Sequence, residues 1–206
     1  MTFDVARGEE FDLTRGCVLD LIRSWMAGGL IAAVWVAFPC TTFSAARRPP
    51  LRSKEWLRGL PSARADPSLA KQLRAGDATL TAALAVASWC RRFNVMGFFE
   101  NPHTSLAWQD RRWQRLVEKG DVIQHVLDFC AFGAVWRKRT RVMGIGSGVI
   151  PSLNRRCGGV RGICHTGLRH VILQGREGSQ LRTKQAEAYP EDLGRAIAAA
   201  LVQRSL

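Results

Sequence analysis

The sequence predicts an α/β domain with a largely parallel sheet. Short apolar runs that read as buried strands alternate with segments of helical periodicity. Hydrophobic residues make up 47% of the 206 residues, which is enough for a substantial core. Two apolar runs, 32–38 and 95–99, are each followed at once by reactive polar residues. Because ligands bind at the carboxyl edge of such sheets, we expect a site there.

The elements are predicted in order along the chain. Residues 3–5 are expected to end a strand, and 18–27 to form a helix that Gly28 terminates. Residues 30–38 are continuously apolar, which is typical of a central parallel strand. A loop rich in arginine and proline follows over 41–67, and Asp77 is the expected N-cap of the next helix. The remaining predictions are helices at 77–93, 105–119 and 191–202, strands at 95–99, 122–129, 137–143 and 170–173, and an irregular stretch at 145–161.

The charge predicts a polyanionic partner. Lysine and arginine number 30 against 17 acidic residues, which gives a net charge of +13. Nucleic acid is the usual partner of such a chain, although a basic surface that only keeps the protein soluble is the alternative. The candidate phosphate-binding residues lie in the basic loop and in the irregular stretch. They are Ser44, Arg47, Arg48, Arg52, Arg155 and Arg156.

Cysteine usage and hydropathy indicate a reducing compartment, cytoplasmic or nuclear. The six cysteines are spread along the chain instead of forming the dense framework of a secreted scaffold. The first twelve residues are too polar for a signal peptide. The apolar run 25–38 is too short to cross a bilayer, so no membrane partner is expected.

Cys40 and Glu100 are the candidate reactive groups. A cysteine after a strand is often just a small buried residue, and a working thiolate needs positive charge, which Arg139 or Arg141 can supply. Glu100 can equally be an ordinary carboxylate at a strand end. Together, a thiol and an acid suit addition to an electron-poor ring that gains a proton during the attack.

These motifs resemble those of the C5-cytosine DNA methyltransferases. The similarity covers residues 3–143 and consists of Pro39-Cys40-x-x-Phe43-Ser44, then Glu100-Asn101, then Arg139-x-Arg141, in the family's order. It implies a Rossmann-like, S-adenosylmethionine-dependent methyltransferase sheet acting on double-stranded DNA. Cys40 would attack C6 of a flipped cytosine, and Glu100 would contact the ring. Arg139 and Arg141 would support the base, and the methyl group would pass to C5.

The resemblance also implies a cofactor site. Asp4, Asp12 and Leu13 resemble the family's later cofactor-contacting positions, and Pro39 is assigned to the same cofactor site. The family's opening strand and glycine-rich turn do not precede Asp4, so an N-terminally truncated domain is expected. Two alternatives stay open. One is a non-catalytic basic DNA-binding module, and the other is half of a split enzyme whose partner chain supplies the missing strand.

A cluster of cysteine and histidine predicts a metal site. Cys157, Cys164 and His170 are candidate zinc ligands, with Cys130 as the fourth. The alternative is a recognition loop whose arginines face phosphates. The expected organisation is a methyltransferase-like domain over 1–145, a small recognition or zinc-binding segment over 146–180, and a C-terminal helix over 181–206 that returns to the first domain.

Overall fold

A computed structural model describes residues 3–120, 122–146 and 150–202. Residues 147–149 of the predicted segment 146–180 and residues 203–206 of the predicted segment 181–206 lie outside the described residues. The chain divides into two units. The first comprises Met1–Ile123 and Met143–Gly148, and the second comprises Gln124–Val142 and Val149–Leu206. The division differs from a boundary at residue 145, because contacts of Asp128 and Cys130 join their segment to the later part of the chain.

A mixed four-stranded sheet confirms the α/β class. Its strand order is β1 (Ala33–Ala37), β2 (Met96–Pro102), β4 (Arg139–Ile145) and β3 (Val122–Asp128). β1 and β2 are parallel, and the other pairs are antiparallel. The described sheet is therefore not mostly parallel, since β4 reverses direction after β3 and lies between it and β2. β1 was expected to be central, but it ends this order and its side chains are largely half-buried.

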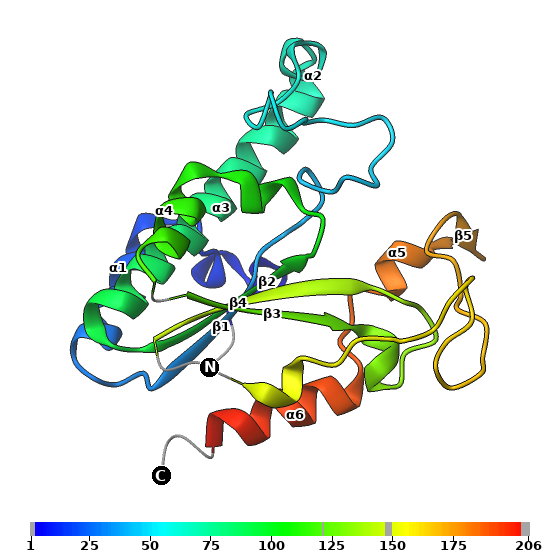
Figure 1. The fold of residues 1–206 in the computed structure, drawn as a ribbon. Helices are drawn as coiled ribbons and strands as arrows, with labels where there is room; N and C mark the ends of the chain where they lie inside the picture. Colours follow the sequence, from blue (N-terminus) through cyan, green and yellow to red (C-terminus); the bar gives the residue numbers. More distant parts are fainter. Residues whose placement is uncertain (1–2, 121, 147–149, 203–206) are drawn as a thin grey trace. The chain divides into compact units, whose positions relative to one another are not determined.

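The first unit packs its helices on the β1–β2 pair, with α1, α3 and α4 gathered on one side (Figure 1). Its core combines apolar residues of α1 and α3 with Phe99 of β2 and with Met143 and Ile145 of β4. The strand expected at 3–5 was wrong, because residues 3 and 4 form no regular element and η1 begins at Val5. The helices of this unit are η1 (Val5–Arg7), η2 (Glu9–Phe11), α1 (Gly16–Ala27), α2 (Pro61–Ala65), α3 (Pro67–Phe93), η3 (Leu106–Gln109) and α4 (Arg111–Glu118).

Helix α3 begins ten residues earlier than predicted. Asp66 is its N-cap and accepts a hydrogen bond from the Leu69 N–H at 2.8 Å, and Pro67 occupies the first turn. Asp77, the expected cap, therefore lies inside the helix. The predicted helix over 105–119 is likewise divided, because Asp110 ends η3 and caps α4 through the Arg112 N–H.

Gly76 lets the loop after β1 pack directly against α3. A Cβ atom at this position would lie 2.3 Å from the hydroxyl oxygen of Thr42 and 3.4 Å from the ring of Phe43. Only glycine therefore permits so close an approach. The loop is held at a fixed place on the helix although it contains no strand or long helix of its own.

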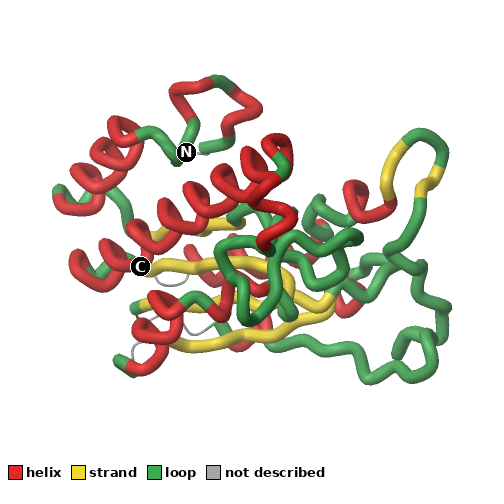
Figure 2. The backbone as a smooth tube through the Cα atoms, turned by 90° about the horizontal axis from the view of Figure 1, so that it is seen from above, coloured by secondary structure: helices red, strands yellow, loops and turns green. Residues whose placement is uncertain are grey.

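The second unit contains much irregular chain, which appears as long green stretches in Figure 2. The predicted helix at 191–202 is confirmed as α6 (Glu191–Val202), which packs against η4 and η5. Residues 170–173 form no strand in the described chain; the nearest bridge joins Ile163 to Arg169. The other elements are η4 (Phe129–Phe132), η5 (Pro151–Leu153), the antiparallel strands β5 (Arg176–Glu177) and β6 (Gln180–Leu181), and α5 (Arg182–Gln185).

In the described part of the chain, no helix combines the length and the apolar character that a bilayer span requires.

Candidate active-site edge and metal centre

The two predicted reactive segments leave the sheet side by side. β1 and β2 are parallel neighbours, and their register pairs Ala37 with Glu100. The side-chain amide of Asn101 donates a hydrogen bond to the Phe38 carbonyl at 2.7 Å. The expectation that the Cys40 and Glu100 segments share one carboxyl edge is therefore confirmed at the level of the strands.

Backbone and aromatic contacts hold this edge in place. The Leu106 N–H donates to the Phe43 carbonyl at 2.9 Å, which links the loop after β1 to the chain after β2. Beneath the edge, Phe38 packs edge-on against Trp108 with centroids 5.7 Å apart. Trp113 contacts Phe38, Trp108 and Phe99 at centroid distances of 6.2, 5.5 and 5.3 Å. This cluster gives both segments a common apolar support.

The candidate groups at the edge differ in exposure. Cys40 is half-buried, whereas Glu100 is only 7% exposed. The burial of Glu100 separates it from an ordinary solvated carboxylate at a strand end. Arg139 and Arg141, which were expected to support the base, lie in the portion of β4 that belongs to the second unit.

The proposed cofactor residues do not form a cradle. Asp4 accepts a hydrogen bond from the Ala6 N–H at 2.9 Å. Asp12 accepts bonds from the N–H and hydroxyl of Thr14, both at 2.8 Å, and these bonds lower its pKa. Both carboxylates thus stabilise local turns. Leu13 packs against the core.

Pro39 lines a different, small space. The cavity there measures about 220 Å³, is bounded by neighbouring threonines and by α3, and receives no contribution from Asp4 or Asp12. Ligand pockets usually exceed about 300 Å³. The four residues assigned to S-adenosylmethionine therefore do not fit that cofactor as placed.

Most candidate phosphate-binding residues are accessible. Arg48, Arg155 and Arg156 are exposed, while Ser44 and Arg47 are half-buried. The Arg47 guanidinium donates to the Gln72 side chain at 3.0 Å, and the Arg155 guanidinium lies 5.1 Å from the centre of the Phe132 ring.

Arg52 corrects the prediction of a phosphate contact at that position. Its side chain is fully buried and forms an ion pair with Asp77 at 2.8 Å. It also donates to the Leu73 carbonyl at 3.0 Å and to the Thr42 hydroxyl at 3.2 Å. Its guanidinium carbon lies 4.1 Å from the centre of the Phe43 ring. Burial lowers the pKa of Arg52, and the bond to Asp77 opposes that effect. Arg52 holds the loop on α3 and does not reach solvent.

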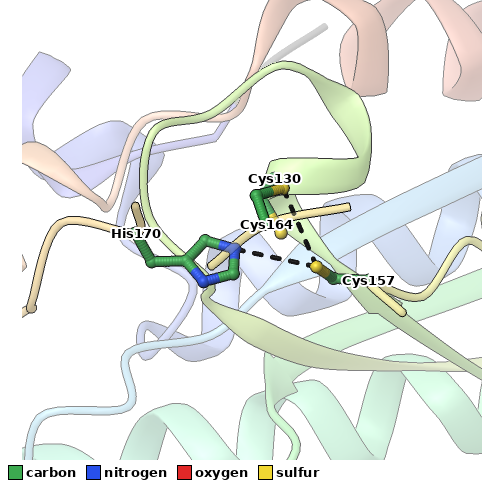
Figure 3. A group of neighbouring side chains, drawn as sticks. All are labelled: Cys130, Cys157, Cys164 and His170. Carbon is green, nitrogen blue, oxygen red and sulfur yellow. Dashed lines mark hydrogen bonds between the residues drawn. The ribbon is translucent and has the colours of Figure 1, made fainter. Parts of the chain in front are cut away.

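The second unit brings together the predicted metal ligands. The ligand atoms of Cys130, Cys157, Cys164 and His170 all lie within 4.8 Å of one another (Figure 3). Cys157 Sγ is 3.7 Å from Cys164 Sγ and 3.7 Å from His170 Nε2. The three cysteines are buried, and none is in a disulfide. This group can bind a metal ion.

Separate segments present these ligands. Cys130 lies in η4, directly after β3, and Cys157 follows η5. A tight turn presents the other two, because the Cys164 N–H bonds to the Leu168 carbonyl at 2.7 Å and the His170 N–H to the Gly162 carbonyl at 2.8 Å. Gly159 allows the segments to meet, since a Cβ there would lie 2.0 Å from the Ile163 carbonyl oxygen.

Asp128 connects β4 to the metal cluster. Its carboxylate is fully buried and accepts two bonds from the Arg139 guanidinium, at 2.9 and 3.0 Å. Arg137 donates a third bond to Asp128 at 3.3 Å, and the Cys157 N–H a fourth at 3.0 Å. Burial acts to raise the pKa of Asp128, but the bonds from Arg139 and Cys157 outweigh it and lower the value. Sequence reasoning missed Asp128, although its place two residues before Cys130 at a strand end was a usable signal.

The cysteine thiols differ in acidity. Burial acts to raise the pKa of Cys157, but hydrogen bonds from His165 and the Gly159 N–H lower it to about 6. Bonds from the hydroxyl and N–H of Thr166 lower the pKa of Cys164 to about 7. Burial and the neighbouring sulfurs raise the pKa of Cys130 to about 12. The pKa values of Cys157 and Cys164 are therefore lower than that of an ordinary cysteine, which eases formation of the thiolate, the form that binds metals.

Comparison with known proteins gave no match: no protein-family profile, no curated protein and no solved structure is significantly similar to this chain.

Proposed function

We propose that the chain is a cytosine-C5 methyltransferase-like domain that binds double-stranded DNA and presents Cys40 and Glu100 to a cytosine base. The observation that carries the proposal is the parallel β1–β2 pair, whose register sets Glu100 beside the strand that leads into Cys40. The bond from Asn101 to the Phe38 carbonyl fixes the two segments to each other. The motif order of the sequence supports the same conclusion.

The chemistry proposed for the edge is reversible addition of a thiol to a pyrimidine. The Cys40 thiolate forms a bond to C6, and the electron pair of the C5–C6 double bond moves into the ring. Glu100 donates a hydrogen bond or proton at N3, which stabilises the charge that develops. Reversal returns the electron pair to the double bond and releases Cys40. Extruding the base from the duplex costs a few kcal/mol, which contacts to phosphates must offset.

The methyl donor implied by the resemblance is S-adenosylmethionine, which would supply a methyl group to C5. The residues first assigned to it stabilise local turns, so no step is derived through it. In the proposal Arg47, Arg48, Arg155 and Arg156 are the DNA contacts, and Arg52 is removed from that role because it is buried. Arg139 and Arg141 belong to the second unit, where Arg139 binds Asp128, and the proposal gives neither of them a role at the edge.

We further propose that the cluster in the second unit binds structural zinc. A tetrahedral zinc site with bonds of about 2.3 Å to sulfur has ligand–ligand edges of about 3.8 Å. The 3.7 Å between the sulfurs of Cys157 and Cys164 matches this value, and the 3.7 Å from Cys157 Sγ to His170 Nε2 is close to the slightly shorter sulfur–nitrogen edge. Three cysteines and one histidine complete four protein ligands, which leaves no open position for catalysis. The zinc would stabilise a segment with little regular structure.

A mechanism-based trap tests the proposal at Cys40. A duplex containing 5-azacytosine accepts a thiol at C6 and a proton at its ring nitrogen, so an adduct forms without a methyl donor. We expect a denaturation-resistant complex with the natural chain and with the Cys17→Ser variant, since Cys17 is an exposed residue of α1 and belongs to neither of the two segments that form the edge. Cys40→Ser should form none. An undiminished adduct with Cys40→Ser removes Cys40 from the mechanism.

A second arm tests methyl transfer itself. A 5-fluorocytosine duplex retains the adduct only after a methyl group has reached C5, so this arm includes S-adenosylmethionine. An adduct with azacytosine alone supports the thiol chemistry and rejects this donor.

The second candidate function is a non-catalytic DNA-binding module. The engagement of Asp4 and Asp12 in local turns favours it, together with the net charge of +13. It predicts salt-dependent duplex binding with no adduct on either modified base.

A further inference from the structure

A basic groove in the first unit lies outside all of the residues assigned above. It is a cavity of about 770 Å³ between the loop at 54–59, α2 and the start of α4. Six cationic and two acidic side chains line it. The cations are Lys54, Arg58, Arg64, Arg111, Arg112 and Arg115, and the acids are Glu55 and Asp110. We call this the Trp56 groove, because Trp56 also lines it.

Some of the cationic side chains in the groove form ion pairs with acidic residues, and others do not. Arg58 bridges Asp77 at 3.4 Å and Asp110 at 3.6 Å, and Asp110 is also bound by Arg112 at 2.9 Å. By contrast, in the described ranges no carboxylate lies within ion-pair distance of Arg64, Arg111 or Arg115. The guanidinium groups of these three residues are therefore available to pair with an anionic group of a ligand.

Trp56 is an aromatic platform on this charged surface. Its side chain is 49% exposed, although tryptophan usually buries its ring. Its backbone is fixed by three hydrogen bonds: its N–H donates to the Ser53 hydroxyl at 3.1 Å, and its carbonyl accepts from Ser53 and Gly59 at 3.4 and 3.0 Å. An exposed ring on a fixed turn loses little conformational freedom when a flat ligand stacks on it.

We propose that the Trp56 groove binds a single-stranded nucleic-acid segment, with phosphates at Arg64, Arg111 and Arg115 and an unpaired base on Trp56. Basic grooves with an aromatic platform are the general solution for single strands, because every base has a face that can stack. A duplex offers the same phosphates but hides its base faces. The inference goes beyond the cytosine chemistry above and does not require Cys40 or Glu100.

The test is binding of a fluorescent 20-nucleotide oligothymidine, measured by anisotropy over a series of salt concentrations. We expect Arg111→Ala/Arg115→Ala to weaken binding at least ten-fold and to reduce the salt slope by about 1.4, for two lost contacts. The charge-matched control Arg23→Ala/Lys119→Ala alters exposed cations outside the groove and should bind nearly as the natural chain does. Trp56→Ala should weaken binding about five-fold or more, and Trp56→Phe much less.

Other results would overturn the inference. If the groove variant and the control variant lose the same affinity for the oligonucleotide, binding depends only on the net charge of the protein. If Trp56→Ala binds as tightly as the natural chain, no base stacks on Trp56. If binding of a duplex probe depends on Trp56 to the same extent, the groove does not select unpaired bases. Binding to vesicles of anionic lipid is measured with the same variants. If vesicle binding depends on the groove residues and oligonucleotide binding does not, the ligand is a membrane surface instead. Because oligothymidine contains no cytosine, failure here is separate from failure of the adduct assay. Matching circular dichroism melting curves would exclude misfolding.

Discussion

The buried carboxylate of Asp128 accepts a hydrogen bond from the backbone N–H of Cys157 at 3.0 Å while Arg139 binds it with two more. One acidic side chain thus joins the Arg-x-Arg segment of β4 to a candidate metal ligand. Arg137 reinforces the connection by donating to the Cys157 carbonyl at 3.0 Å. The orientation of Cys157 therefore depends on residues that do not themselves bind metal.

Asp128→Asn is expected to weaken zinc binding about 10- to 100-fold, the usual effect of losing a group that orients a metal ligand. The measurement is competition against a chelator, with metal content by mass spectrometry. Asp192→Asn, at an exposed position of α6, is the control. Arg139→Gln, which leaves Arg137 on the carboxylate, should give a smaller loss. Unchanged affinity in both Asp128→Asn and Arg139→Gln would disprove the link.

Zinc itself should stabilise the second unit. Cys157→Ser is expected to reduce the bound metal from about one ion per chain to none, since a four-ligand site loses a thiolate. Chelator treatment of the natural chain should lower the thermal midpoint, and added zinc should restore it. Cys17→Ser should keep a full metal content because Cys17 is outside the cluster. Full metal content in Cys157→Ser would reject the site.

Arg52→Met is expected to lower the free energy of unfolding by about 1–3 kcal/mol, because it leaves the Leu73 carbonyl and the Thr42 hydroxyl without their buried donor, while Asp77 keeps its ion pair with Arg58. Urea unfolding followed by circular dichroism measures the change. Arg48→Met, at an exposed position in the same loop, should stay within about 0.5 kcal/mol. Similar small effects for both variants would show that Arg52 does not hold the loop.

Gly76→Ala and Gly194→Ala should have opposite effects although both replace a helical glycine. Gly76→Ala should cost about 1–3 kcal/mol, because its Cβ meets the Thr42 hydroxyl. Gly194 in α6 has nothing within 4 Å of such a Cβ, so alanine there should stabilise by about 0.5–1 kcal/mol. Urea midpoints of both variants give the comparison, and a gain from Gly76→Ala would contradict the packing described.

Asp110→Asn tests the pH dependence of an ion pair. Burial acts to raise the pKa of Asp110, but the bonds from Arg112 lower it below its unfolded value of about 3.9. Its contribution to stability is therefore full above about pH 4 and is lost as the pH falls through the folded pKa. Asparagine keeps the helix cap, so the variant should lose roughly 1 kcal/mol at pH 7.

The pH series supplies the check on this pair. The stability gap between Asp110→Asn and the natural chain should be constant above about pH 4 and should narrow as the pH falls further in urea titrations. Asp66→Asn, a cap without a described ion pair, should show little gap at any of these pH values. A gap for Asp110→Asn that widens as the pH falls would reverse the assigned sign.

Local signals in the sequence were sufficient for several elements. Gly28 ends α1, and Pro190 precedes α6, whose predicted bounds 191–202 match the structure. The apolar runs before Cys40 and Glu100 did form strands, since neighbouring apolar residues specify a buried strand without distant information. The predicted start of α3 was wrong because Asp66 and Asp77 are both capping residues by type, and only the structure shows that the Asp66 side chain accepts the capping bond from Leu69.

The sequence by itself determined the α/β class, the basic charge, the strand-end placement of Cys40 and Glu100 and the candidate set of metal ligands, because these depend on composition and short-range order. Tertiary structure alone decided that Arg52 is buried, that Asp128 accepts a hydrogen bond from the Cys157 N–H and that Trp56 lines a groove with six cationic side chains. These roles depend on which residues meet after the chain folds. The sequence does not distinguish an arginine that faces a phosphate from one that pairs with a buried carboxylate. Only the packing of the folded chain separates these two roles.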